Sequence, residues 1–67
     1  MLNLTEVRLS NGETLLIEDR ADHAAIGQAL AENGHFTTTR LRDGMTGAVK
    51  SPITILERSI AYLQPRD

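Results

Sequence analysis

The stretch Thr5–Glu18, TEVRLSNGETLLIE, decides the fold because its turn residues and its apolar pattern agree on one strand register. Asn11-Gly12 marks a tight turn between two strand-forming runs. A two-residue loop would mix charged and apolar side chains on the face that must become the core. A three-residue loop, Ser10–Gly12 with Gly12 in the left-handed conformation, separates them. The stretch therefore predicts a β-hairpin with a three-residue loop.

This register pairs Val7 with Leu15 and Thr5 with Ile17. Alternate residues of a strand project to opposite faces, so one face of the hairpin becomes apolar and the other polar. Leu16 is the exception, because it is an apolar residue on the polar face. It is either an exposed contact for a partner or covered by the helix or a chain terminus. The apolar face holds Val7, Leu9, Leu15 and Ile17, and the polar face holds Glu6, Arg8, Thr14 and Glu18.

The chain has 67 residues and no cysteine, which predicts a single small domain over residues 1–67 without disulfides. A core of this size contributes only a few kcal/mol, and small domains usually need a disulfide, a metal or association in addition. Association is the expected support, and we favour a homodimer. The first residues, MLNLTE, have neither the basic nor the apolar region of a signal peptide, and no apolar run is long enough to cross a bilayer. We expect a cytoplasmic protein with no membrane partner.

The formal net charge is −2, but it is unevenly distributed. Residues 1–34 contain two basic and six acidic residues, whereas residues 35–67 contain five basic and three acidic residues. The two halves therefore attract each other, within one fold or between copies. Solvated faces whose signs differ by chance are the alternative.

A helix is predicted over residues 23–32. Asp22 can cap its first turn, and Gly34 can end it in the left-handed conformation. Its apolar stripe of Ile26, Ala29 and Leu30 is narrow, which is typical of a helix lying on one side of a sheet. The β-branched run that follows predicts a strand over residues 36–42.

A second stripe on this helix contains only small residues, Ala24, Gly27 and Ala31. Glycine inside a helix is unfavourable by about 1 kcal/mol relative to alanine, so its presence calls for a packing explanation. Close contact with the domain's own sheet is one explanation. A helix-to-helix contact in a homodimer is the other.

The remaining residues predict a turn or loop, a strand, a second short turn and a last strand. Residues 43–47 form either a tight hairpin turn or a flexible loop, and residues 43–52 as a whole are either strand or flexible loop. A strand at 53–56 begins after Pro52, which cannot donate to a ladder. Residues 57–59 form a short turn, and residues 60–64 form a last strand that ends at Pro65. The predicted fold is a small α+β domain, in the order β-β-α-β-β-β, with a mostly antiparallel twisted sheet or a partly open barrel.

Catalytic and metal-binding patterns are weak. Asp19, Asp22 and His23 could gather at the helix start with His35 as a fourth ligand, but helix capping by Asp22 explains the same residues. No serine lies in a strand-turn-helix elbow, and Asp43–Gly47 lacks the lysine of a P-loop. We expect neither an enzyme nor a bound cofactor or metal.

Nucleic-acid binding is the main alternative function. Arg40 and Arg42 are two residues apart and share a strand face, and Lys50 could add a third phosphate contact. However, Phe36 and Tyr62 are the only aromatic residues, and the net charge is negative.

The preferred interpretation is a small, non-catalytic protein-interaction module that self-associates, such as an adaptor, inhibitor or regulatory subunit. Sheet edges left free by the hairpin and the last strand would pair with another chain. The expected contact residues are the exposed Leu16, the rim charges Arg40 and Arg42, and the helix stripe of Ala24, Gly27 and Ala31.

Overall fold

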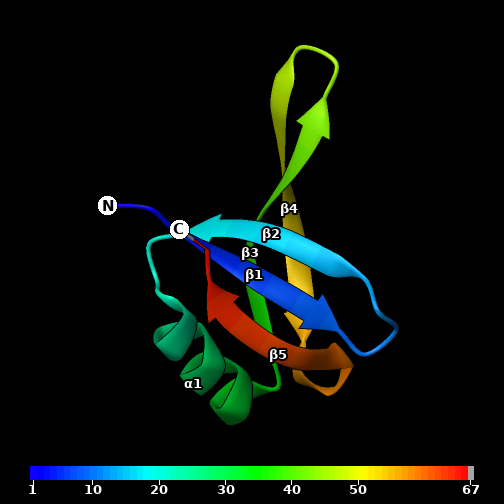
Figure 1. Cartoon of the computed structure of the whole chain (residues 1–67). Helices are drawn as coiled ribbons and strands as arrows, with labels where there is room; N and C mark the ends of the chain where they lie inside the picture. Colours follow the sequence, from blue (N-terminus) through cyan, green and yellow to red (C-terminus); the bar gives the residue numbers. More distant parts are fainter. Residues whose placement is uncertain (67) are drawn as a thin grey trace.

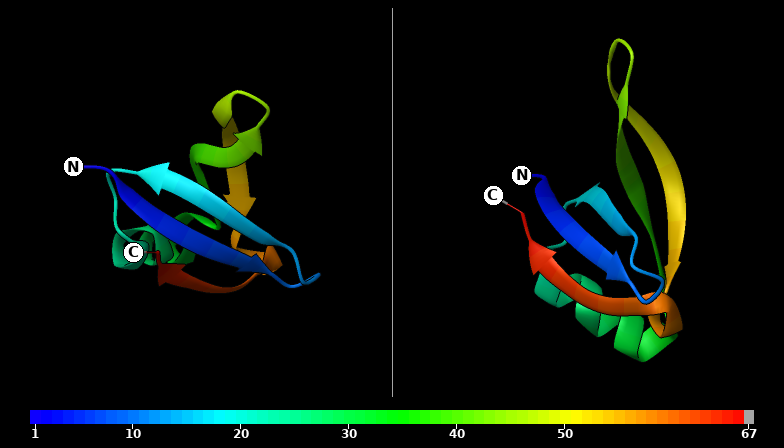
Figure 2. Two further views of the ribbon diagram at one scale, coloured as in Figure 1. Left: turned by 45° about the horizontal axis from the view of Figure 1, so that its top comes forward. Right: turned by 45° about the vertical axis from the view of Figure 1, so that its right-hand side comes forward.

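The computed structural model describes residues 1–66, which form one five-stranded antiparallel sheet and one helix (Figures 1 and 2). The spatial order of the strands is β4-β3-β2-β1-β5. The predicted α+β class and the order β-β-α-β-β-β are confirmed, and the sheet stays open instead of closing into a barrel. The elements are β1 Asn3–Leu9, β2 Thr14–Asp19, α1 His23–Asn33, β3 His35–Gly44, β4 Gly47–Leu56, the short 3-10 turn η1 Glu57–Ser59, and β5 Ile60–Pro65.

The β1–β2 hairpin has the predicted three-residue loop. The backbone N–H of Leu9 donates to the carbonyl of Glu13 at 2.8 Å, and the N–H of Gly12 donates to the carbonyl of Leu9 at 3.0 Å. Gly12 has a φ of 96°, a conformation that residues with a Cβ rarely adopt. The predicted pairs of Val7 with Leu15 and of Thr5 with Ile17 are both present.

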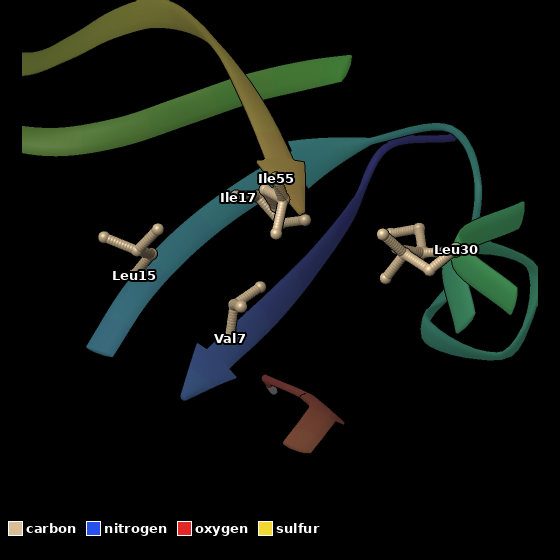
Figure 3. Close-up of a cluster of buried hydrophobic side chains, with 6 residues drawn as sticks. Val7, Leu15, Ile17, Leu30 and Ile55 are labelled. Atoms are coloured by element: carbon tan, nitrogen blue, oxygen red, sulfur yellow. The ribbon is translucent and has the colours of Figure 1, made fainter. Parts of the chain in front are cut away.

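The core lies between α1 and the face of the sheet that it covers, called here the inner face (Figure 3). The opposite face, which carries Glu6, Arg8 and Thr14, is called the outer face. Strands β1, β2 and β4 and the helix all contribute to the core, so it unites the sheet and the helix. Its buried apolar residues are Val7, Leu15, Ile17, Ile26, Leu30 and Ile55.

Helix α1 begins and ends at the predicted caps. Oδ1 of Asp22 accepts a hydrogen bond from the N–H of Ala25 at 2.8 Å. Gly34 has a φ of 78°, and its N–H donates to the carbonyl of Leu30 at 2.7 Å. The helix extends to Asn33, one residue beyond the predicted end.

One buried polar side chain ties β3 to the connection between β2 and α1. The hydroxyl of Thr38, which is 6% exposed, donates to Oδ2 of Asp19 at 2.8 Å. Oδ1 of the same carboxylate accepts from the N–H of Ala21 at 2.9 Å. The buried hydroxyl is thereby satisfied, as buried polar groups require.

The prediction that a strand begins after Pro52 was wrong. Strand β4 begins at Gly47 and continues through Pro52, which lies opposite Thr39 of β3. Proline is accepted there because β4 is an edge strand, so the missing N–H removes no bond to a second neighbour. Residues 43–52 are therefore strand on both sides of a tight turn at Met45-Thr46, and not a flexible loop.

The outer part of the β3–β4 hairpin projects beyond the rest of the sheet (Figure 1). Strand β2 pairs with β3 at only three positions, and the last of these joins Leu16 to Leu41. Residues 42–50, called here the arm, are all exposed, and in this part β3 pairs only with β4. Met45 at the turn is 105% exposed.

Strand β5 returns the chain to its beginning. It pairs with β1, so that Thr5 lies opposite Pro65. The N–H of Arg66 donates to the carbonyl of Leu4 at 2.9 Å, which continues the ladder beyond the strand. The predicted last strand is confirmed and includes Pro65.

The glycine in the middle of α1 generates a prediction on stability. A methyl group added at Gly27 would lie 3.9 Å from Cδ1 of Leu63, which is ordinary van der Waals contact. We expect Gly27→Ala to raise the free energy of unfolding by about 0.5–1 kcal/mol, because alanine restricts the unfolded chain more. Urea denaturation measures this change.

Gly34→Ala is the matched control for Gly27→Ala. It forces alanine into the left-handed conformation at the end of α1, so we expect a loss of roughly 1 kcal/mol. A loss of stability in Gly27→Ala would show that α1 and β5 pack more tightly than this contact indicates.

Candidate functional site

A hollow lies where β2 and β3 separate at the base of the arm. Its volume is about 560 Å³. The hollow exists because the β2–β3 ladder stops at Leu16 and Leu41 while both strands continue in different directions. It is lined by residues 14–16 of β2 and residues 40–43 of β3, together with Ala48 and Arg66.

Leu16 and Leu41 form an apolar pair at this hollow. They lie directly opposite each other in the ladder, and both are half-buried. Glu6 of β1 lies opposite Leu16 on its other side, and Lys50 of β4 lies opposite Leu41. A row across four strands of the outer face thus has two leucines between a negative and a positive side chain. Leu16 is on the polar face, as the register predicted.

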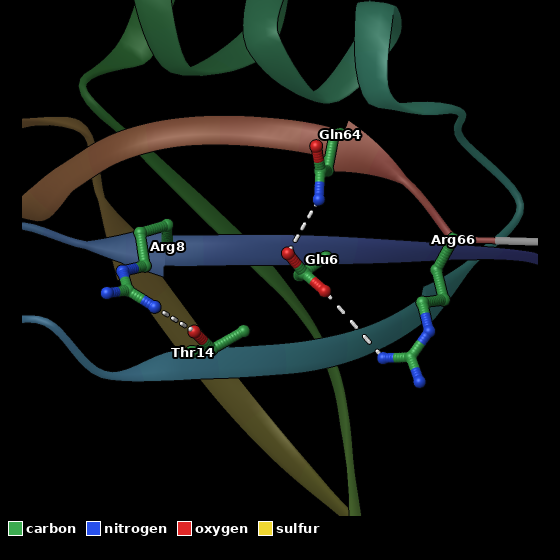
Figure 4. Close-up of polar contacts among 5 residues, drawn as sticks. All are labelled: Glu6, Arg8, Thr14, Gln64 and Arg66. Atoms are coloured by element: carbon green, nitrogen blue, oxygen red, sulfur yellow. Dashed lines mark hydrogen bonds and ion pairs between the residues drawn. The ribbon is translucent and has the colours of Figure 1, made fainter.

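Ion pairs and hydrogen bonds hold the charged side chains around the two leucines. Nε2 of Gln64 donates to Oε2 of Glu6 at 2.7 Å, and Nη1 of Arg66 lies 3.7 Å from Oε1 of the same carboxylate (Figure 4). On the other side, Nζ of Lys50 lies 2.9 Å from Oε1 of Glu18. Both pairs join residues 1–34 to residues 35–67, so the opposite charges of the two halves meet within the fold. The result is an apolar centre with a polar rim, the usual anatomy of an interface.

The three basic residues considered for nucleic acid do not share one face. Arg40 pairs with Ile17 and therefore projects from the inner face, and Arg42 follows it two residues later. Lys50 lies opposite Leu41 on the outer face, where it pairs with Glu18. The structure thus brings Arg40 and Arg42 together and separates Lys50 from them.

Arg40 has an unusual environment. Its Nε is buried and has no hydrogen-bond partner among the described residues. Neither Arg40 nor Arg42 makes an ion pair within residues 1–66. The inner face therefore carries two adjacent positive charges that the described part of the fold does not neutralise.

The small-residue stripe of α1 divides between two environments. Gly27 faces Leu63 of β5, but a methyl group added there would be at ordinary van der Waals distance, so packing against the domain's own sheet does not require a glycine. Ala24 and Ala31 are exposed. The helix is therefore not a uniform contact surface.

The residues considered as metal ligands have local roles or no cluster. Asp22 caps α1, and Nδ1 of His35 lies 3.1 Å from the carbonyl of Asn33. Residues 1–66 contain no group of three or more histidine, cysteine, aspartate or glutamate side chains able to hold a metal ion. Among the same residues, no helix has the length and apolar character needed to cross a membrane.

Leu41 and Met45 were not singled out from the sequence, and the structure places them at the hollow and at the tip of the arm, respectively. In the sequence, Leu41 stands between Arg40 and Arg42. Only the pairing of β2 with β3 shows that it lies on the outer face beside Leu16. The paired residues are far apart in the chain, so the sequence has no local signal for this register. Met45 is exposed because the β3–β4 hairpin is long enough to form the arm. This length was not predicted because the strand was expected to begin after Pro52, whereas β4 begins at Gly47.

Comparison with known proteins gave no relative: no protein-family model, no curated protein and no solved structure matches this chain.

The ion pair at the rim of the hollow and the buried hydrogen bond of Thr38 are expected to contribute differently to the free energy of unfolding. The Lys50 side chain is 58% exposed and that of Glu18 is 19% exposed, so the pair lies at the surface and we expect Lys50→Gln to lower the free energy of unfolding by about 1 kcal/mol or less. The loss should disappear at about 1 M NaCl, where surface charges are screened. Urea denaturation at low and high salt measures both values.

Thr38→Val is the contrasting variant. It leaves Oδ2 of the partly buried Asp19 without its donor, and we expect a loss of about 1–3 kcal/mol that salt changes little. If Lys50→Gln proved the more damaging of the two, the rim and not the core would stabilise the join between β2 and β3.

Proposed function

We propose that this protein is a small, non-catalytic interaction module that self-associates through the arm and the hollow at its base. The observation that carries the proposal is the half-buried pair of Leu16 and Leu41 beside an arm whose residues are all exposed. The arm of one copy lies in the hollow of the second copy. In a twofold dimer the exchange is reciprocal, so each copy contributes one arm and one hollow.

The arm supports this proposal because it lacks packing of its own. A two-stranded hairpin with no further packing is at best marginally stable in water. Met45 is 105% exposed and Val49 is 42% exposed, so the apolar side chains of the arm gain most from contact with another chain. The two leucines of the hollow offer an apolar surface for that contact.

The charges of the chain also support self-association. Residues 1–34 carry an excess of four negative charges, and residues 35–67 carry an excess of two positive charges. These opposite charges of the two halves favour the encounter of two copies. The wall of the hollow itself carries Arg40, Arg42 and Arg66 against Asp43, so the attraction comes from the two halves as a whole and not from the lining of the hollow.

Free edges of the sheet provide main-chain groups for the same contact. Beyond Leu41, the side of β3 that faces away from β4 has no partner strand among the described residues. Strand pairing across chains would satisfy these groups, as in other cases of β-strand addition.

Light scattering over a tenfold range of concentration tests the proposal. We expect the wild-type mass to rise toward twice the 7.4 kDa of one chain. Met45→Ser should weaken dimerisation by about fivefold to tenfold, because it removes an apolar contact worth roughly 1 kcal/mol without touching the core. Leu41→Gln should weaken it from the side of the hollow.

Leu56→Ser is the matched control for Met45→Ser. Leu56 is another exposed apolar side chain of the same hairpin, 38% exposed, but it lies at the opposite end of β4 from the arm. It should leave the association constant unchanged. A wild-type protein that stays monomeric, or a Leu56→Ser variant that dissociates as readily as Met45→Ser, would contradict the proposal.

A further inference from the structure

The inner face has a second surface, which α1 does not cover. The helix packs toward one end of the face, and at the other end Leu9 and Ile53 stay partly exposed beside the buried core. Here Leu9, Leu15, Ile53 and Ile55 line a hollow of about 210 Å³ together with Ser59. This volume is below the roughly 300–1,000 Å³ of pockets for small molecules, so the hollow suits a single apolar side chain of a partner.

Arg40 and Arg42 lie next to this apolar hollow. Arg40 pairs with Ser51, which is two residues before Ile53 on the same face of β4. Arg40 is therefore a diagonal neighbour of Ile53. Arg42 continues the same face toward the arm, where it lies opposite Val49. Apolar and basic side chains thus follow one another along a single line of the inner face.

Arg40 and Arg42 have no carboxylate partner among residues 1–66, in contrast to Lys50 and Arg66; Arg8, Arg20 and Arg58 also have none there. The ion pairs of Lys50 and Arg66 both lie on the outer face. The buried Nε of Arg40 has lost water and gained no acceptor. A carboxylate from outside the chain cannot reach this buried atom, but it can bind the guanidinium groups of the partly exposed Arg40 and the exposed Arg42 through charge-assisted hydrogen bonds.

We propose that this surface binds an extended acidic segment of another protein, with one apolar side chain in the hollow and carboxylates on Arg40 and Arg42. In an extended chain, every second residue projects to the same side. An apolar residue followed by glutamates two and four positions later therefore matches the line from Ile53 to Arg40 and Arg42. Arg40 and Arg42 also line the hollow at the base of the arm, so an acidic segment on this surface would compete with the arm of a second copy. The proposal adds a second kind of partner and does not require self-association.

Nucleic acid fits this surface less well than an acidic peptide. Single-strand binding relies on bases stacked on aromatic side chains. Tyr62 lies opposite Arg8 and therefore on the outer face, and Phe36 packs against the core. The hollow is apolar, and it accepts an aliphatic or aromatic side chain without a base-stacking platform.

Chemical-shift titration of the isotope-labelled protein tests the proposal. The probe is the peptide Ser-Leu-Ser-Glu-Ser-Glu-Ser, and the control peptide has lysine in place of both glutamates. The protein carries Met45→Ser, so that a failure of peptide binding is distinct from a failure of self-association. We expect the glutamate peptide alone to shift the amide signals around Arg40, Arg42 and Ile53, and its binding to weaken as salt rises.

Two charge reversals complete the experiment. Arg42→Glu should weaken binding of the glutamate peptide by about fivefold or more, because a charge-assisted contact is lost and a like charge replaces it. Arg20→Glu makes the same change at an exposed arginine outside this surface and should leave binding within about twofold. Equal binding of both peptides, equal effects of both reversals, or binding of an oligothymidylate in place of the peptide would overturn the proposal.

Discussion

The structure depends on the register of its first hairpin. The left-handed conformation of Gly12 allows a three-residue loop, and that loop places Val7 opposite Leu15 and Thr5 opposite Ile17. A shift by one residue would turn the apolar side chains to the outer face and leave α1 without a surface to cover. The helix, the core and the distinction between the two faces of the sheet all follow from this register.

A second constraint is the short ladder between β2 and β3. Because it contains only three residue pairs, the β3–β4 hairpin leaves the sheet early and becomes an arm. The same separation opens the hollow at Leu16 and Leu41. The short ladder thus produces both the projecting arm and the apolar hollow at its base. For this reason we propose that the two meet in a reciprocal dimer.

Local signals predicted most of the fold. The turn at Asn11-Gly12, the cap at Asp22 and the stop at Gly34 each act within a few residues, and each is found as expected. Strand β4 was misjudged because the effect of Pro52 depends on whether the strand is at an edge, which is a property of the assembled sheet. The face of Leu16 was predicted from its own hairpin, but its partner Leu41 required the long-range pairing of β2 with β3. Arg40 and Arg42 were recognised as a pair, whereas the apolar hollow beside them joins β1, β2 and β4 and has no signature in any one segment.

The pairing of β1 with β5 has a consequence for the order in which the protein forms. Thr5 and Pro65 are neighbours in the ladder although they are nearly a whole chain apart. The entropy lost on closing so large a loop is recovered only after local hairpins and the helix have reduced the effective separation of the ends. During synthesis, β1 must therefore wait with one edge unpaired until the last strand has left the ribosome. Over this interval the nascent chain exposes the same kind of strand edge that promotes aggregation in partly folded proteins.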